Sequence, residues 1–197
     1  MTRVKYAVRM LLADVLPDAP TTTAEALTIY DAAPAVEPDF MIGTWHGAEL
    51  PTNHPLDGML AASGWWGKQF LDAEAVHPLL FPTADGSALW ALNPALAFSG
   101  LGVATRVPGI RSRDFSGAIA KLKPVLGTTA PKARLRTTRY RGVDTATMVY
   151  DQLPVNDVFR LLDDVPGCET VLGAMDLRGS ARPYFFVLRR DESLRVR

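Results

Sequence analysis

The chain of 197 residues has a single cysteine, Cys168, and only three histidines, none of them after His77. One cysteine excludes an internal disulfide and is typical of a reducing compartment. The histidines lie apart and no second cysteine accompanies them, so the short ligand spacing of a metal centre is missing and the sequence predicts no metal site. Cys168 lies in a turn-like Pro-Gly-Cys-Glu segment with no histidine nearby, so we expect no reactive thiol there.

The chain also lacks a charge excess and a long apolar run. Its 21 Lys and Arg residues balance its 21 Asp and Glu residues, whereas a nucleic-acid or anionic-membrane surface needs a net basic patch. No run approaches the ~20 apolar residues that span a bilayer, and residues 6–16 are not followed by the cleavage site of a signal peptide. We therefore predict a cytoplasmic protein with no nucleic-acid partner and no membrane insertion. Phosphate-binding glycine loops and nucleophile elbows are missing too, so no cofactor is predicted.

The most informative segment that is present is Gly43-Thr44-Trp45-His46-Gly47, in which a glycine lies two residues before and two residues after a tryptophan. Glycine permits a close approach of neighbouring chain segments, and the indole of Trp45 would fill the floor of a barrel. Strand alternation places His46 on the face opposite Trp45, where we expect it to be exposed.

This motif resembles the first strand of calycin-like barrels such as lipocalins, fatty-acid-binding proteins and nitrobindins. The wider sequence resembles a bacterial family named after its GXWXG motif, whose C-terminal half is a domain of unknown function. The resemblance runs over roughly residues 22–191 and is carried by residues 39–47, 50–58, 64–68, 133–136, 140–142, 148–151 and 184–191. It implies a barrel and a small apolar ligand, without a settled activity. Nitrobindins hold haem through a histidine in their C-terminal part, and none follows His77 here, so haem is not expected.

Apolar periodicity predicts helices at residues 3–16 and 23–33, the second with Thr22 or Thr23 as its cap and Glu25 in a capping box. From residue 40 the period becomes that of strands. Short apolar segments separated by turn residues predict strands at residues 42–49, 64–70, 76–81, 88–92, 134–140, 145–150, 155–162, 170–176 and 184–190. About nine or ten strands would close into a barrel. The expected fold is therefore mainly β: an antiparallel calycin-like β-barrel with N-terminal helices and a helical cover segment.

We expect one domain over residues 1–197, because this length allows a substantial core. Its predicted parts are N-terminal helices (1–38), a first strand block with the GXWXG motif (39–92), a cover segment (93–133) and a C-terminal β-meander (134–197). The cover segment is too apolar for an exposed loop and includes a predicted short helix capped by Asp114. It is either a static cover of one barrel end or a lid over a ligand entrance.

The leading functional prediction is that the barrel binds a small hydrophobic molecule that carries one hydroxyl, carbonyl or amine. A mostly apolar interior with a few polar side chains suits such a ligand. Strand phase decides which residues share a face but not which face points inward. The predicted ligand-binding residues are Trp45, Trp66, Met148, Tyr150, Asp157, Phe159 and Phe186.

His54 and Asp57 support an alternative function. Asp57 follows His54 by three residues and could orient its ring as a general base, giving an enzyme that performs non-redox proton chemistry, such as an isomerase, cyclase or hydrolase. The same segment, residues 53–58, also has the residue types of a rigid turn, in which Asp57 would bond backbone amides and His54 would pack on an aromatic ring. A structural or regulatory partner-binding protein and a homodimer are further alternatives that the sequence leaves open.

Overall fold

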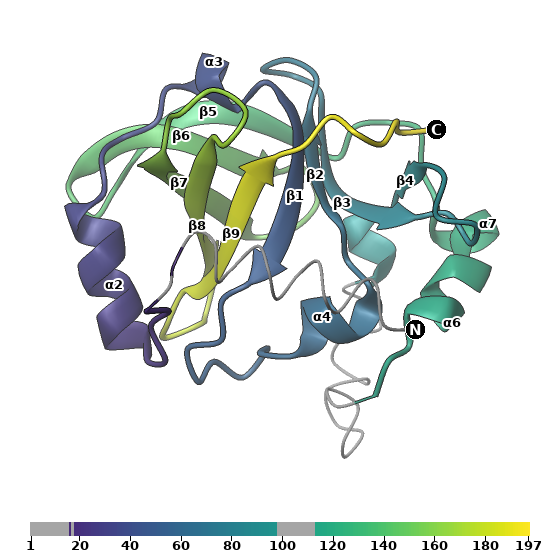
Figure 1. Cartoon of the computed structure of the whole chain (residues 1–197), viewed down its shortest axis with the longest axis horizontal. Coiled ribbons are helices and arrows are strands. Elements are labelled where there is room, and N and C mark those ends of the chain that lie inside the picture. Colours follow the sequence, from purple (N-terminus) through teal and green to yellow (C-terminus); the bar gives the residue numbers. More distant parts are fainter. Residues whose placement is uncertain (1–15, 17, 98–112) are drawn as a thin grey trace.

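The computed structural model describes residues 16, 18–97 and 113–197. Its nine strands form one sheet in the order β2-β1-β9-β8-β7-β6-β5-β3-β4, and β2 also pairs with β3. This additional pairing closes eight strands into an antiparallel barrel and leaves β4 outside it, beside β3 (Figure 1). The barrel that the sequence predicts is confirmed. The expectation that nine or ten strands close it is wrong, because β4 has only three residues and pairs with no other strand of the sheet than β3 among the described residues.

Each of the nine strands lies where the sequence predicts a strand. They are β1 (Gly43–Glu49), β2 (Gly67–Phe70), β3 (Val76–Pro82), β4 (Leu89–Ala91), β5 (Ala133–Tyr140), β6 (Val143–Tyr150), β7 (Val155–Asp163), β8 (Thr170–Leu177) and β9 (Tyr184–Arg190). The helices that the structure bounds are α2 (Thr23–Ala32), α3 (Pro38–Met41), α4 (Met59–Ser63), α6 (Ser116–Lys121) and α7 (Lys123–Leu126). β2 begins later than predicted because α4 ends at Gly64, which adopts a left-handed conformation with φ +77°.

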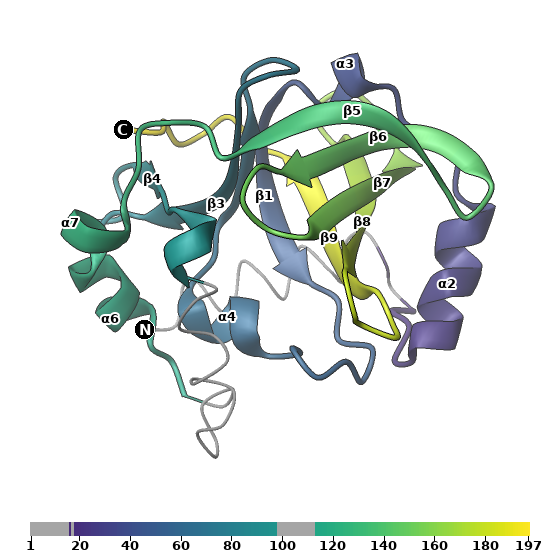
Figure 2. The same cartoon turned by 180° about the vertical axis from the view of Figure 1, so that it is seen from behind.

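The predicted helix at 23–33 is confirmed as α2, and its capping box forms as expected. Thr22 accepts a hydrogen bond from the backbone of Glu25 at 3.2 Å, and the Glu25 carboxylate accepts one from the backbone of Thr22 at 3.1 Å. Figures 1 and 2 show α2 alongside the barrel. It covers the outer face of β8 and β9 through a buried cluster made of Ala26, Tyr30, Leu50, Leu172, Ala174, Phe185 and Val187.

Where the sequence predicts one helix after Asp114, the structure has two short ones, α6 and α7, and residues 94–97 of the same segment are also helical. Pro124 has no N–H to donate to the carbonyl of Ala120, so the first helix cannot continue through it. In Figures 1 and 2 α7 lies beside β4, and α6 lies between α7 and α4. Residues 98–112, and residues 3–15 of the helix predicted at 3–16, lie outside the described residues.

The two ends of the barrel differ. α3 lies at one end and α4 at the other (Figures 1 and 2). At the α3 end the indole N–H of Trp45 donates to the carbonyl of Met41 at 2.7 Å, and the guanidinium carbon of Arg190 lies 4.5 Å from the centre of the Trp45 ring. Arg190 also donates to the backbone carbonyls of Phe40 and Ile42. Trp45 and Arg190 therefore plug this end, as expected for a tryptophan on the barrel floor. Among the described residues, no helix has both the length and the apolar character needed to cross a bilayer.

Candidate functional site

The glycines of the GXWXG motif allow large side chains to lie against β1. A Cβ at Gly43, where φ is +130°, would lie 2.5 Å from Nη1 of Arg190, and one at Gly47 would lie 2.1 Å from Cη2 of Trp65. Gly67 in β2 would similarly place a Cβ 1.9 Å from the carbonyl oxygen of Trp45. The close approach that the motif predicts is therefore confirmed. Its consequence is that the Trp65 ring lies on the inner side of β1.

A buried ion pair crosses the barrel interior. Nζ of Lys68 in β2 lies 2.8 Å from Oδ2 of Asp157 in β7, and the two side chains are 3% and 1% exposed. These strands are four positions apart in either direction around the eight-stranded ring, so the two side chains meet from opposite walls. Lys68 also donates to the carbonyl of Pro78 at 3.1 Å, and the hydroxyl of Tyr150 donates to Oδ2 of Asp157 at 3.4 Å.

Aromatic rings surround the ammonium group of Lys68. Its Nζ lies 5.0 Å from the ring centre of Phe186, 5.5 Å from that of Trp65 and 5.8 Å from that of Tyr150. Such contacts stabilise a desolvated cation through the ring quadrupoles. Gly173 makes room for one of these rings, since a Cβ there would lie 2.3 Å from Phe186. The result is a charged pair within an otherwise apolar and aromatic interior.

Burial determines the protonation of the groups around this pair. It raises the pKa of Asp157 above the usual range, and the adjacent Lys68 ammonium opposes that shift. Burial, followed by the charge of Asp157, raises the pKa of Tyr150 well above its ordinary value. Burial, followed by the charge of Glu49, also raises the pKa of Tyr184 well above its ordinary value. Both phenols are therefore neutral hydrogen-bond donors at physiological pH.

Two buried polar atoms beside Lys68 have free hydrogen-bonding capacity. Within the described part of the chain, Oδ1 of Asp157 and the indole Nε1 of Trp65 have no hydrogen-bond partner. Most buried polar side-chain atoms in proteins are paired, so an orphaned acceptor and an orphaned donor in one interior need an explanation. Together they could bind a polar group of a ligand.

Six of the seven predicted ligand-binding residues lie on the inner side of the barrel and are buried, namely Trp45, Met148, Tyr150, Asp157, Phe159 and Phe186. Trp66 does not. It packs outside the barrel with Leu80, Leu89 and Ala91. Adjacent residues of an extended chain point to opposite faces, and Trp65 takes the inward position instead. Whether the six inner residues bind a ligand stays a prediction.

His46 is on the outer face as predicted, but it is not freely exposed. Its ring stacks on that of Trp66 with a centre-to-centre distance of 4.7 Å, and its side chain is only 16% exposed. Burial lowers the pKa of His46, although the nearby carboxylate of Asp191 opposes this shift. The outward position of Trp66 thus explains why His46 is covered.

His54 and Asp57 make the hydrogen bonds of a rigid turn. Oδ2 of Asp57 accepts from the backbone N–H of His54 at 2.8 Å and from that of Thr52 at 3.0 Å. Nδ1 of His54 accepts from the backbone N–H of Leu56 at 3.1 Å, and the imidazole lies 5.3 Å from the ring of Tyr184. These are the contacts that the turn interpretation expects. The catalytic role of the pair stays a hypothesis.

Glu49 fixes the position of α4 at the same end of the barrel. Its buried carboxylate accepts hydrogen bonds from the backbone N–H groups of Gly58, Leu60 and Ala61 at the start of this helix. A carboxylate at a helix N-terminus satisfies amides that lack intrahelical partners. Because Trp65 directly follows α4, this contact also helps to place the indole over Gly47.

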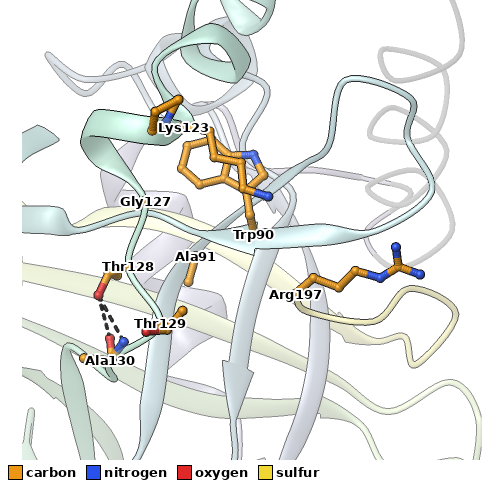
Figure 3. Close-up of a pocket in the computed structure, with 9 residues that line it drawn as sticks. Trp90, Ala91, Lys123, Gly127, Thr128, Thr129, Ala130 and Arg197 are labelled. Atoms are coloured by element: carbon orange, nitrogen blue, oxygen red, sulfur yellow. Dashed lines mark hydrogen bonds between the residues drawn. The ribbon is translucent and has the colours of Figure 1, made fainter.

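A pocket of about 540 Å³ lies outside the barrel between β4, α7 and the C-terminal tail. Figure 3 shows Lys123 and the Arg197 guanidinium on separate sides of it rather than converging on one point. It contains none of the predicted site residues; its lining is Trp90, Ala91, Lys123, Pro124, Gly127, Thr128, Thr129, Ala130 and Arg197. No group of three or more His, Cys, Asp or Glu residues in the described ranges is placed to hold a metal ion.

Sequence reasoning missed Lys68 and Trp65. Trp66 precedes β2 and the register shift between Gly67 and Gln69, and it does not share the inner face. One signal was available, since Lys68 lies in β2 two residues before the inward Phe70. Alternation alone then places the lysine on the same face as Phe70. Its pairing with Asp157 could not be inferred, because the two residues are far apart in sequence and meet only when the barrel closes.

Comparisons with known proteins agree with this architecture. Residues 28–86 match the family described as GXWXG protein, and residues 131–190 match a domain of unknown function (DUF4334). The chain is similar to the crystal structure of a protein from Thermomonospora curvata, with 28% sequence identity and a TM-score of 0.64, over 94% of this chain and 99% of that one. A comparison with curated proteins gives no match. The two family matches confirm the resemblance that the motif predicts: this chain carries the GXWXG domain followed by the C-terminal domain of unknown function.

Proposed function

We propose that the barrel interior binds a small, mostly apolar molecule and holds its polar group beside Lys68 and Asp157. A β-barrel fold is compatible with ligand binding. The observation that carries the proposal is the Lys68–Asp157 pair, which is buried among aromatic rings. Sites for small molecules are typically apolar cavities with a few well-placed polar groups.

Stability alone is a poor reason for this ion pair. The desolvation of two charges offsets most of their attraction, and well-packed apolar residues of similar volume often serve as well or better. Polar groups that orient a ligand would account for a charged pair at this position. The unpaired atoms of Asp157 and Trp65 support the same interpretation, because a ligand would satisfy them.

The arrangement of the barrel ends suggests the route of a ligand. Trp45 and Arg190 plug the α3 end, so a ligand would reach Lys68 from the end near α4. Tyr184 and His54 lie at that end. Along the inner wall, Tyr184 is opposite Met175, which in turn is opposite Asp157. Tyr184 therefore lies in the same row of inward residues as Asp157.

Isothermal titration calorimetry with naphthalene and 1-naphthol, two uncharged probes, tests the proposal. Two neighbouring residues of β9 provide matched variants: Phe186 points into the barrel, whereas Phe185 packs under α2. We expect saturable binding to the wild type. Phe186→Leu should change the Kd by about tenfold, the effect of altering one apolar group in a pocket, and Phe185→Leu should leave the Kd nearly unchanged. Absence of saturable binding by both probes, or equal effects of the two variants, would contradict the proposal.

A further inference from the structure

We infer that the interior site selects an uncharged ligand with a hydroxyl, or an equivalent group that both donates and accepts a hydrogen bond. This inference rests on the proposed function and specifies the ligand class of the same site. It follows from two properties of the interior, its charge balance and its free hydrogen-bonding atoms.

The charge balance disfavours an ionised ligand. Lys68 and Asp157 neutralise each other at 2.8 Å. In the part of the chain that the structure describes, two further charged residues face inward, and each has its own partners: Glu49 is held by backbone amides of α4, and Arg190 lies 3.4 Å from Glu169. A carboxylate or ammonium on the ligand would thus add a buried charge without a counter-ion. An uncompensated buried charge costs several kcal/mol.

The free atoms require both a donor and an acceptor on the ligand. Within the ion pair with Lys68, Oδ1 of Asp157 is a carboxylate oxygen and can only accept, and the indole N–H of Trp65 can only donate. Lys68 has a third N–H besides those directed at Asp157 and the carbonyl of Pro78. A hydroxyl satisfies both kinds of atom, whereas an ether leaves Asp157 unpaired and an ammonium leaves Trp65 unpaired.

Five probes that share one ring system separate these properties in the wild type at pH 7. They are naphthalene, 1-naphthol, 1-methoxynaphthalene, 1-naphthoate and 1-naphthylmethylammonium. We expect 1-naphthol to bind about 5- to 150-fold more tightly than 1-methoxynaphthalene, which corresponds to the cost of about 1–3 kcal/mol for a buried acceptor left unpaired. Both ions should bind more weakly than naphthalene.

Variants of the pair test the charge argument directly. Asp157→Asn leaves the Lys68 charge unbalanced and should shift the preference from 1-naphthol towards 1-naphthoate, whereas Lys68→Met should shift it towards 1-naphthylmethylammonium. Because either single variant could fail to fold, the double variant Lys68→Met/Asp157→Leu provides an independent test. Its ratio of 1-naphthol to 1-methoxynaphthalene affinities should fall to about one. The exposed pair Arg139–Asp144 gives the matched control, and Arg139→Gln/Asp144→Asn should leave the ratio unchanged.

The outcomes distinguish this inference from the proposed function. If no probe binds the wild type, the proposed function fails. If probes bind but 1-naphthol has no advantage over 1-methoxynaphthalene, or 1-naphthoate binds best, the proposed function stands and the inference on ligand class is overturned. The same holds if the double variant keeps the wild-type preference.

Discussion

The indole of Trp65 lies directly against the backbone of Gly47, so that a Cβ at Gly47 would come within 2.1 Å of Cη2 of that ring. The second glycine of the GXWXG motif is therefore needed for space, and no positive φ is involved at this position. The contact brings Trp65 to the inner side of β1, where its ring borders the Lys68 ammonium at 5.5 Å. The motif thus shapes the wall of the interior site as well as the floor of the barrel.

Gly47→Ala should destabilise the protein. The added methyl group must displace a buried ring, and overpacking of this kind typically costs about 1–3 kcal/mol of unfolding free energy. Urea denaturation measures this loss. Gly117→Ala is the matched control, because Gly117 lies in α6 with open space around it, and alanine favours a helix.

A double-mutant cycle checks the cause of the Gly47→Ala effect. Trp65→Leu removes the ring that the new methyl group would meet, so in that background Gly47→Ala should cost less than in the wild type. Additive effects of the two substitutions would show that Gly47 is required for some reason other than contact with Trp65.

Removing one member of the Lys68–Asp157 pair should be far more costly than removing both. Lys68→Met or Asp157→Leu alone leaves a buried charge without its partner, which costs about 3–5 kcal/mol. The double variant Lys68→Met/Asp157→Leu should be nearly as stable as the wild type, or more stable. Urea midpoints of the four proteins measure the difference. A double variant clearly less stable than the wild type would mean that the pair is retained for stability, which removes the main support for a ligand role.

Two histidines should make the fold less stable in mild acid. Burial lowers the pKa of His46 and of His77 below the ordinary value of a histidine. A lowered pKa in the folded state means that folding favours the neutral ring. The contribution of each neutral imidazole to the unfolding free energy is therefore complete above the unfolded-state pKa, and it is lost as pH falls through the folded-state pKa. Unfolding free energy should therefore fall between pH 7 and about pH 5. His46→Gln and His77→Gln should each give a shallower decline, and an unchanged decline in both variants would contradict the assignment.

Much of the fold follows from the sequence because strand signals are local. Alternation and turn residues are sufficient to place all nine strands, and Thr22 with Glu25 marks the start of α2. The number of strands in the barrel does not follow, because closure depends on the pairing of β2 with β3 and on the peripheral position of β4. Both are consequences of tertiary packing rather than of local pattern.

The candidate site was predictable in part. Tyr150 and Asp157 were placed on the interior face, and the structure brings them together at 3.4 Å. Trp66 is predicted inside because two adjacent tryptophans cannot be assigned to faces without knowing where β2 begins, and this depends on where α4 ends, at Ser63 with Gly64 as its cap. Lys68 was missed because a lysine is normally assumed to be solvated, and only the Asp157 carboxylate on the opposite wall allows its burial.

The last prediction separates a turn role of His54 from a catalytic one. In the structure Nδ1 of His54 accepts from the backbone N–H of Leu56 at 3.1 Å. His54→Ala removes this acceptor and should lower the unfolding free energy by about 1–2 kcal/mol. His54→Asn places an amide oxygen near the position of Nδ1 and should restore much of that loss, although asparagine cannot act as an acid or base near neutral pH. Asp57→Ala should be at least as destabilising as His54→Ala, because it leaves the backbone amides of Thr52 and His54 without their acceptor. If His54→Asn is no more stable than His54→Ala, the hydrogen bond to Leu56 does not account for the histidine at this position, and the turn role loses that support.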